Sequence, residues 1–329
     1  MASRTLLRLA AAAAAALAGC ACGSRSGPEL NVYAAQGQEV TTPLTDAWQK
    51  KNPDLRINVI RGGAGELLSR VRAEKANPLG DVFWGGALEL YRANDDLFAA
   101  TDVPGEADAF ASRDPVKKWH PWTRNVIHLA VNTRRVPDDL PRSLRDLADP
   151  KWASRGRIGL SNPASSGTAY TIVPALITVH GWDFLEALLR NVRMTDYSET
   201  SFKWLKDGEV GAGFLFESIL KDYISAGAPL KMVIPEEGII QQADGCGLLA
   251  GARHPAAAQA FLAWMAGEEA HGIVRGAVGR RSARKGVAPP DGLIDLTGLK
   301  VIEPDPEWVT SKRDDILRRF AEARARAQP

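Results

Sequence analysis

Strands, glycine-containing turns and amphipathic helices alternate along the first part of the chain. The predicted strands are residues 29–34, 55–60 and 81–84, and the predicted helices are residues 41–51 and 66–75. Such a βαβαβ order predicts a parallel sheet that is covered by helices. The loops at the carboxyl ends of its strands are then available for a ligand, so the order favours an α/β fold with a binding cleft.

The same alternation returns in the middle of the chain. The apolar strands expected at residues 126–131 and 245–249 suit a crossing between two lobes. A chain of 329 residues is long enough for two lobes with separate cores. No sequence repeat with a period of roughly 20–50 residues is visible, so the lobes are expected to be alike in architecture only. Further strands are predicted at 157–160, 211–216 and 230–234, and further helices at 168–178, 182–190, 201–206, 255–265 and 311–326.

The N-terminus has the pattern of a bacterial signal peptide. Arg4 and Arg8 precede a short apolar run, and the sequence Leu-Ala-Gly-Cys ends at Cys20. This matches a lipobox, in which the cysteine is acylated after cleavage. The apolar run is shorter than the about 20 residues of a membrane span. We therefore predict a signal peptide at 1–19, lipidation of Cys20, a tether at 20–28, and an exported protein on the periplasmic or cell-surface side of the membrane. An ordinary secretory signal with an incidental cysteine is the alternative.

Charge and motif content argue against several classes of protein. The formal net charge is +2, and removing the signal peptide with its two arginines brings it close to zero, which gives no support for nucleic-acid binding. The cysteines (Cys20, Cys22 and Cys246) and the five histidines show no metal-ligand spacing, so neither a metal nor a cofactor is predicted. The GxSxG, HExxH and P-loop motifs of common enzymes are also missing from the sequence. The sequence thus favours a protein that is not an enzyme, with an exported hydrolase as an alternative.

The order of landmarks resembles the extracellular solute-binding proteins of ABC importers, in particular the branch that binds ferric ion, phosphonates and sugar phosphates. The match extends over nearly the whole mature chain. The motifs that carry it are VYAAQG at 32–37, GDVFW at 80–84, NPASSG at 162–167, DGEVGAG at 207–213, GAPLKMVIPEEG at 227–238 and AAAQAFLAWM at 256–265.

The resemblance implies a periplasmic-binding-protein type 2 fold, in which two Rossmann-like α/β lobes are joined by hinge strands. Lobe 1 is expected to comprise residues 29–127 and 246–290, and lobe 2 residues 128–245 and 291–329. Such a protein closes its lobes on a solute and is then recognised by the permease. The expected partners are a small anionic solute, an ABC permease in the inner membrane and, through the lipid, the membrane itself. A monomer is expected.

Iron is the alternative ligand. Ferric binders of this branch hold the metal through a histidine and a glutamate from the first lobe and two adjacent tyrosines from the second. The corresponding positions here are Gly37, Gly86, Ser218 and Ile219, and none of them ligates a hard ferric ion as tyrosinate or carboxylate would. The sequence contains no Tyr-Tyr pair. A phosphonate, a sugar phosphate or a similar anion is therefore the predicted ligand.

Ser165, Ser166, Gly167 and Thr168 are the first candidates for binding an anion. They open a predicted helix, where hydroxyls, unpaired backbone N–H groups and the positive end of the helix dipole converge on negative charge. An N-cap that only satisfies its own helix is the alternative. Two serines and a threonine exceed what one cap requires, and the family places this loop at the cleft.

A second glycine-rich turn and an arginine pair are further candidates. Gly63 and Ala64 precede a helix, and glycine lets backbone N–H groups approach an anion closely. A plain strand-to-helix turn explains them equally well. Either Arg280 or Arg281 can grip phosphate or carboxylate with its planar guanidinium. A solvated basic loop is the alternative for the arginines.

The remaining candidates lie at the cleft by their position in the family. Aromatic side chains at strand ends can cover an apolar or sugar face, and a carboxylate can hold an amine or a hydroxyl. Core packing is the alternative for the aromatics, and an exposed charge at the end of a strand is the alternative for the glutamate. These candidates are Gln36, Gly37, Trp84, Gly85, Tyr197, Ser198, Phe216 and Glu217.

Overall fold

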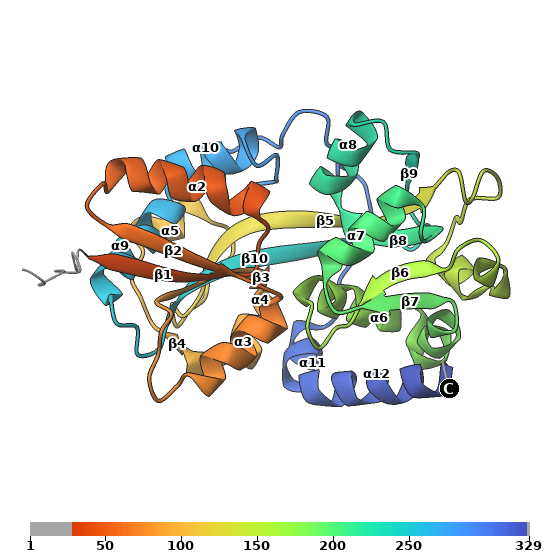
Figure 1. Ribbon diagram of the computed structural model, residues 1–329, viewed down its shortest axis with the longest axis horizontal. Coiled ribbons are helices and arrows are strands. Elements are labelled where there is room, and N and C mark those ends of the chain that lie inside the picture. Colours follow the sequence, from red (N-terminus) through yellow and green to blue (C-terminus); the bar gives the residue numbers. More distant parts are fainter. Residues whose placement is uncertain (1–27, 328–329) are drawn as a thin grey trace, which may run out of the picture.

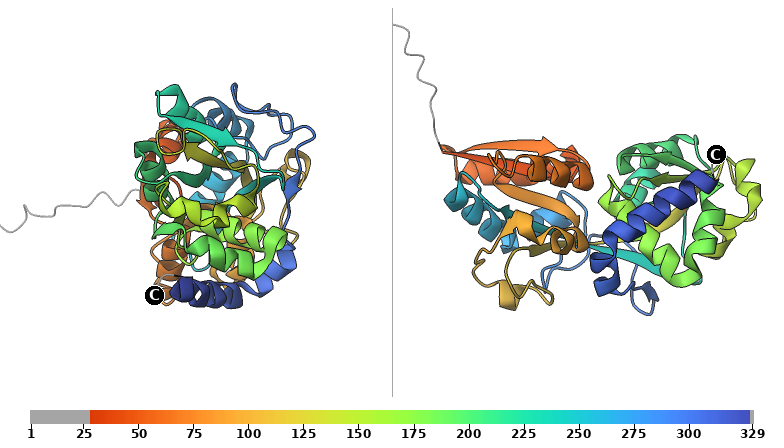
Figure 2. Two further views of the ribbon diagram at one scale, coloured as in Figure 1. Left: turned by 90° about the vertical axis from the view of Figure 1, so that its right-hand side faces the viewer. Right: turned by 90° about the horizontal axis from the view of Figure 1, so that it is seen from below.

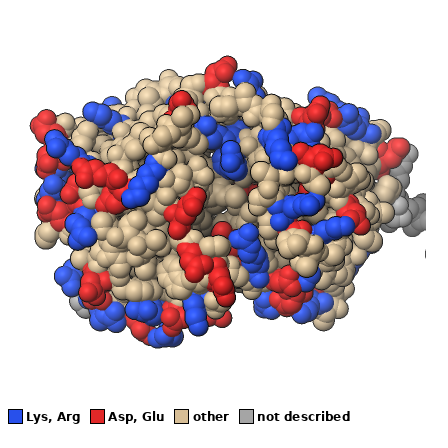
Figure 3. Space-filling model, turned by 180° about the vertical axis from the view of Figure 1, so that it is seen from behind, with Lys and Arg blue, Asp and Glu red and all other residues tan. Residues whose placement is uncertain are grey.

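The computed structural model describes residues 28–327. Two lobes lie side by side along the long axis of the molecule, and strands run from one into the other (Figures 1 and 2). The predicted signal peptide and the lipidation site Cys20 lie outside the described residues. On the face shown in Figure 3, basic and acidic side chains are interspersed, with no large area of one sign.

One sheet extends through both lobes. The order along it is β2-β1-β3-β10-β5-β8-β6-β7, and β4 and β11 pair with β10 while β9 pairs with β5. The strands are β1 (Glu29–Ala34), β2 (Arg56–Arg61), β3 (Val82–Ala87), β4 (Phe98–Ala99), β5 (His120–Asn132), β6 (Ile158–Ser161), β7 (Val192–Thr195), β8 (Ala212–Phe216), β9 (Leu230–Val233), β10 (Ile239–Leu249) and β11 (Val301–Ile302).

Parallel pairing builds each lobe, and antiparallel pairing joins the two. In lobe 1, β1 pairs in parallel with β2 and β3; in lobe 2, β6 pairs in parallel with β7 and β8. The long strands β5 and β10 lie between them and pair antiparallel with each other. This confirms the predicted two-lobed α/β architecture. The lobe limits expected at residues 127/128 and 245/246 fall inside β5 and β10.

Helices cover the sheet of each lobe (Figure 1). Three short 3₁₀ helices, Asp95–Leu97, Leu144–Ala148 and Pro150–Ala153, complete the described elements. Lobe 1 carries α2 (Gln38–Lys51), α3 (Ala64–Ala73), α4 (Leu88–Ala93), α5 (Glu106–Ala109), α9 (Pro255–Met265) and α10 (Glu268–Gly276). Lobe 2 carries α6 (Gly167–Leu189), α7 (Ser198–Asp207) and α8 (Glu217–Ser225), with α12 (Arg313–Ala327) against α6, and α11 (Pro306–Ser311) contacts both α4 and α6.

The longest helix, α6, changes direction at Gly181. This residue has φ +78°, a left-handed backbone conformation that glycine adopts without steric cost. The break agrees with the two separate helices predicted at 168–178 and 182–190. By length and composition α6 is apolar enough to cross a membrane, but its apolar residues are largely buried in the core of lobe 2.

A third connection between the lobes is the strap, residues 277–300, which leads from α10 to β11. It contacts β5, because Arg124 N donates to the carbonyl of Arg281 at 3.0 Å. Farther along it passes α8, where Lys221 Nζ donates to the carbonyl of Asp291 at 2.6 Å. The strap therefore brings residues 280 and 281 to the region where the lobes meet.

Candidate functional site

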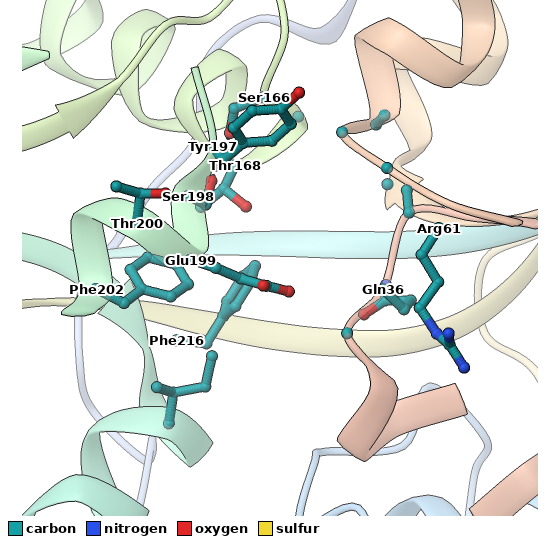
Figure 4. Close-up of a pocket in the computed structure, with 18 of the residues that line it drawn as sticks. Gln36, Arg61, Ser166, Thr168, Tyr197, Ser198, Glu199, Thr200, Phe202 and Phe216 are labelled. Atoms are coloured by element: carbon teal, nitrogen blue, oxygen red, sulfur yellow. Dashed lines mark hydrogen bonds between the residues drawn. The ribbon is translucent and has the colours of Figure 1, made fainter. Parts of the chain in front are cut away.

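A cavity of about 450 Å³ lies between the two lobes. Its lobe 1 wall comes from the segments that precede α2 and α3, and its lobe 2 wall comes from the first turns of α6 and α7 together with Phe216. Figure 4 shows Gln36 and Arg61 on the lobe 1 side, opposite Thr168 and Tyr197 on the lobe 2 side. A concave site of this size suits a small-molecule ligand.

Four helices of ten or more residues begin at the cavity. Their N-cap residues, Gly37 of α2, Gly63 of α3, Ser166 of α6 and Tyr197 of α7, all line it. Unpaired N–H groups and the helix dipole make such ends favourable for an anion. The first turns of α2, α3 and α7 each contain a glutamate, whereas that of α6 contains no acidic residue. The start of α6 therefore faces the least competition from the chain's own carboxylates.

The first turn of α6 presents unpaired donors to the cavity. Ser166 Oγ accepts a hydrogen bond from Ala169 N at 3.2 Å and lies 2.6 Å from Ser198 Oγ. Thr168 is only 9% exposed, and its hydroxyl makes no hydrogen bond with any described residue. The N–H groups of Gly167 and Thr168 also have no partner in the described part of the chain. One hydroxyl and two N–H groups are thus available to a ligand.

At the lobe 1 wall, Gln36 links a buried carboxylate to a buried guanidinium. Its Nε2 donates to Asp244 Oδ2 at 3.1 Å, and its Oε1 accepts from Arg280 Nη1. Asp244 also accepts from Asn125 Nδ2 at 2.8 Å and from Gln242 Nε2. Burial raises the pKa of Asp244. Because one end of the Gln36 amide faces an acceptor and the other a donor, its orientation is fixed.

Arg280 is a nearly buried cation with few partners. It is 4% exposed, and burial lowers its pKa. Its guanidinium donates one hydrogen bond within the described residues, to Gln36, and lies 5.3 Å from the ring centroid of Phe216. A guanidinium has five N–H donors, and buried charges in proteins are normally paired. The carboxyl group of Asp244, which also bonds Gln36, acts on the Arg280 guanidinium through its charge, but no described carboxylate forms an ion pair with it.

Charges of both signs lie at the rim of the cavity. Arg61 and Lys203 are exposed there, and so are the carboxylates of Glu39, Asp196 and Glu199. Water and salt screen exposed charges strongly, and a buried charge much less. The buried Arg280 should therefore affect the cavity's preference for solutes of one charge more strongly than the charged residues at the rim do.

Eleven of the sixteen predicted site residues line this cavity. The structure thus brings together segments that are far apart in the sequence, from both lobes and the strap. The eleven are Gln36, Gly37, Gly63, Ala64, Ser166, Gly167, Thr168, Tyr197, Ser198, Phe216 and Arg280. The other five, Trp84, Gly85, Ser165, Glu217 and Arg281, do not line it.

The expected cleft role of Trp84 does not hold, because its indole lies in the core of lobe 1. Trp84 is 0% exposed, and its ring packs edge-on against Trp122 with centroids 5.2 Å apart. Gly85 lies behind Gln36, whose side chain occupies the space that a Cβ at Gly85 would need. Core packing, the alternative considered for the aromatics, is correct for Trp84.

Three further candidates bond to the protein itself. Ser165 Oγ donates to the carbonyl of Asp196 at 2.8 Å, so its hydroxyl is already used. Glu217 and Arg281 form a bidentate ion pair with each other, with N–O distances of 2.8 and 2.9 Å. Glu217 is therefore not an exposed charge at the end of a strand, and it does not line the cavity.

The sequence predictions missed several cavity residues. The buried Gln242 and Asp244 lie on β10, and polar residues in the middle of an apolar crossing strand were a signal that could have indicated them. Arg61 is the last residue of β2, directly before the glycine-rich turn, so the sequence pattern could also have indicated it. The remaining cavity residues outside the predicted set are Ala35, Gln38, Glu39, Gly62, Gly86, Asp196, Glu199, Thr200, Phe202, Lys203 and Ile219.

The lobes are in contact beside the cavity. Gly65 N, in α3, donates to the carbonyl of Ser165 at 3.2 Å. A Cβ at Gly65 would lie 2.3 Å from the carbonyl oxygen of Ala164, and one at Gly63 would lie 2.7 Å from that of Ser165. The backbone of lobe 2 therefore approaches these glycines more closely than any side chain permits.

The family model of the bacterial extracellular solute-binding proteins matches residues 30–277. The chain belongs to this family. Its members are binding proteins rather than enzymes, and as a solute-binding component of an ABC importer the chain is exported and works with a permease. The family assignment confirms the resemblance that the six sequence motifs indicated.

Relatives of this solute-binding protein are named for different ligands. The chain is 25% identical over 298 residues to the Fe(3+)-binding periplasmic protein of Serratia marcescens, covering 86% of this chain and 87% of that one. It is 25% identical over 255 residues to a probable ABC transporter periplasmic-binding protein of Sinorhizobium fredii, covering 71% and 68%. The structure of AfuA from Actinobacillus pleuropneumoniae, with exogenous fructose 6-phosphate bound, has a TM-score of 0.84 and 25% identity, covering 91% and 99%.

In this solute-binding protein the strap is anchored by a buried histidine. His271 of α10 is 0% exposed, its Nδ1 lies 2.7 Å from Ser282 Oγ, and its Nε2 has no hydrogen-bond partner among the described residues. Burial, together with the charge of Arg284, lowers the pKa of His271 to about 4. The imidazole is therefore neutral in the folded protein at neutral pH.

Acidification is expected to destabilise the fold through His271. Because the unfolded state binds the proton at a higher pH than the folded state, the free energy of unfolding should fall as the pH drops from about 6.5 to about 4. The loss should be on the order of 2 kcal/mol at pH 4.5. Urea unfolding at pH 7 and pH 4.5 measures it, with His271→Gln as the comparison. Equal losses in the wild type and the variant would contradict this role for His271.

Proposed function

We propose that this solute-binding protein captures a small anionic solute, such as a phosphonate or a sugar phosphate, in the interlobe cavity and delivers it to its permease. The observation that carries the proposal is the buried Arg280, whose guanidinium lines the cavity with a single hydrogen bond to the described residues. Charge-assisted bonds from arginine to phosphate or carboxylate are among the strongest hydrogen bonds in proteins.

The start of α6 supports the same ligand class. The N–H groups of Gly167 and Thr168 and the hydroxyl of Thr168 have no hydrogen-bond partner among residues 28–327, and both residues line the cavity with Arg280. Helix N-termini of this kind bind phosphate through their N–H groups and dipole. The fructose 6-phosphate in the structure of AfuA, a protein of the same fold, is consistent with a phosphorylated solute.

Ferric ion is less well supported, although a relative binds it. The described residues contain no cluster of three or more His, Cys, Asp or Glu side chains that is placed to hold a metal ion. Gly37, Gly86 and Ile219 line the cavity at positions where ferric binders have ligands, and none has a ligating side chain. Tyr197 is the single tyrosine in the cavity wall, whereas the ferric site of this branch uses a pair.

The proposal includes the anchor and the oligomeric state. Cys20 carries the lipid that holds the mature protein at the membrane surface, and the protein acts as a monomer. The lipobox sequence supports the first statement. Mass spectrometry of the mature N-terminus and light scattering of the lipid-free protein test them.

A thermal-shift screen of residues 28–329 tests the ligand class. The panel contains fructose 6-phosphate, 2-aminoethylphosphonate, inorganic phosphate, citrate and ferric citrate. A ligand at about 100 times its Kd contributes roughly 2.7 kcal/mol, which raises the melting temperature by roughly 4 °C in a protein of this size. We expect such a shift with a phosphorylated or phosphonate compound. A shift with ferric citrate and with none of the phosphorus compounds would favour the iron alternative.

A further inference from the structure

Glu217 and Arg281 form a buried, bidentate ion pair outside the cavity. Arg281 Nε donates to Glu217 Oε2 at 2.8 Å, and Arg281 Nη2 donates to Oε1 at 2.9 Å. The side chains are 7% and 12% exposed. Although burial acts to raise it, the neighbouring His128 and Arg281 lower the pKa of Glu217 to about 2. The pair is thus fully charged at neutral pH.

The strap backbone completes this pair. Ile294 N donates to Glu217 Oε1 at 3.0 Å, and Arg281 Nη2 donates to the carbonyl of Ile294. Neither Glu217 nor Arg281 lines the cavity. The bonds are therefore made within the protein, and a solute in the cavity does not replace any of them.

Each partner of the pair is the sequence neighbour of a cavity residue. Arg280 precedes Arg281 on the strap, and Phe216 precedes Glu217 at the start of α8. Arg280 Cζ lies 5.3 Å from the ring centroid of Phe216. Two neighbouring contacts therefore join the strap to the start of α8. The contact between Arg280 and Phe216 lies at the cavity wall, and the ion pair of Arg281 with Glu217 lies outside it. Arg280 lines the cavity and its neighbour Arg281 does not, so holding Arg281 on the outside of the strap keeps Arg280 on the inside.

The ion pair connects structural units that belong to different lobes. Glu217 is the first residue of α8 in lobe 2. The strap comes from lobe 1, where Arg280 N donates to the carbonyl of Val274 in α10 at 3.0 Å. Removing one member of a buried ion pair leaves an unpaired buried charge, which is strongly unfavourable. Moving the strap away from α8 would separate the two buried charges at a similar cost.

We infer that Glu217 and Arg281 are positioning residues for the anion site: their ion pair holds the strap against α8 so that the Arg280 guanidinium faces the cavity. The inference rests on the proposed function, since it assigns Arg280 to the solute. Neither Glu217 nor Arg281 touches the solute itself. Both residues act on affinity through Arg280.

Affinity measurements on Glu217→Gln and Arg281→Lys test the inference. The probe is the tightest binder among fructose 6-phosphate, 2-aminoethylphosphonate and inorganic phosphate, and calorimetry gives its Kd. Each variant is expected to bind the probe about tenfold more weakly than the wild type. Arg281→Lys keeps the positive charge but loses the bidentate geometry, so it tests positioning with the smaller risk to folding.

Glu237→Gln is the matched control. Although burial acts to raise it, hydrogen bonds from Ser143 and from the N–H of Leu144 contribute to lowering the pKa of Glu237 to about 2. It also bonds His180 and does not line the cavity. Its substitution should lower the melting temperature as Glu217→Gln does, while the Kd stays within about twofold of the wild-type value. Equal loss of affinity in both variants would show a general effect of stability and overturn the inference.

A double-mutant cycle with Arg280→Gln separates this inference from the proposed function. If Glu217 acts through Arg280, Glu217→Gln changes Kd by less than about twofold once Arg280 is replaced. A further tenfold loss in that background would show a direct role for Glu217 and overturn the inference. The inference would also be overturned if Glu217→Gln and Arg281→Lys kept the wild-type Kd while Arg280→Gln bound weakly. That result would leave the proposed function intact. If Arg280→Gln itself keeps the wild-type Kd, the proposed function fails first.

Discussion

Replacing Arg280 by glutamine is expected to weaken binding of a phosphorylated or phosphonate solute by about 100-fold or more. Arg280 is 4% exposed and its guanidinium donates one hydrogen bond to the described residues, so water would screen its attraction for an anionic solute only weakly. Glutamine keeps a donor for Gln36 but removes the charge and the planar fork. Calorimetric titration of the wild type and the variant with the same solute measures the loss.

Arg284→Gln is the control for Arg280→Gln. Arg284 lies on the same strap, but its guanidinium donates to the carbonyl of Ala266 at 2.9 Å and to Glu268, away from the cavity. Its substitution should leave Kd unchanged. A loss of less than about threefold for Arg280→Gln would remove Arg280 from the solute site.

Replacing Gly65 by alanine is expected to weaken binding by roughly 10- to 100-fold without unfolding either lobe. The added Cβ would lie 2.3 Å from the carbonyl oxygen of Ala164, where ordinary contacts begin at 3.4 Å. Since the atom it meets is backbone, the lobes relieve the contact by separating. Gly65 is in the first turn of α3 and has no left-handed φ, so alanine fits the helix itself.

Calorimetry gives the affinity of Gly65→Ala, and small-angle scattering gives its shape. The ligand-free variant should be as stable as the wild type, and added solute should compact it less. Gly272→Ala is the matched control, because Gly272 is also helical, in α10, and a Cβ there meets nothing within 4 Å. Wild-type affinity for Gly65→Ala would show that the contact between α3 and the Ala164 carbonyl is not part of the closed state.

Local pattern was sufficient to predict most of the fold. The strand predicted at 29–34 coincides with β1, and the helix predicted at 255–265 coincides with α9. Both have clear apolar periodicity between turn residues. The crossing strand predicted at 126–131 is longer in the structure, His120–Asn132, because its first half pairs with β10 and not with a local partner. Pairing between distant segments is invisible to local periodicity.

The parts of the candidate site that are formed by backbone features were predictable from the sequence. The parts that depend on the direction of a side chain were less predictable. The glycine and serine residues that begin α3 and α6 line the cavity, because a helix that follows a parallel strand starts at the ligand edge of the sheet. The sequence indicated both Arg280 and Arg281 as candidate ligand residues, and only Arg280 lines the cavity. Which one does so depends on Glu217, a residue on another element.

Trp84 shows the same limit for an aromatic side chain. The end of β3 lies at the cavity, where Gly86 is part of the wall. The side chain of Trp84 points to the opposite face of the sheet, where Trp122 and Phe261 pack against it. The face that each strand presents to the core is set by helices that are distant in the sequence, here α9.

A crystal structure of residues 28–329 with the solute from the thermal-shift screen tests the central claim most directly. The account predicts an anionic group in the interlobe cavity, with its oxygens within hydrogen-bonding distance of the Arg280 guanidinium and of the N–H groups of Gly167 and Thr168. A metal ion in the cavity, or a solute whose anionic group lies away from Arg280, would contradict it.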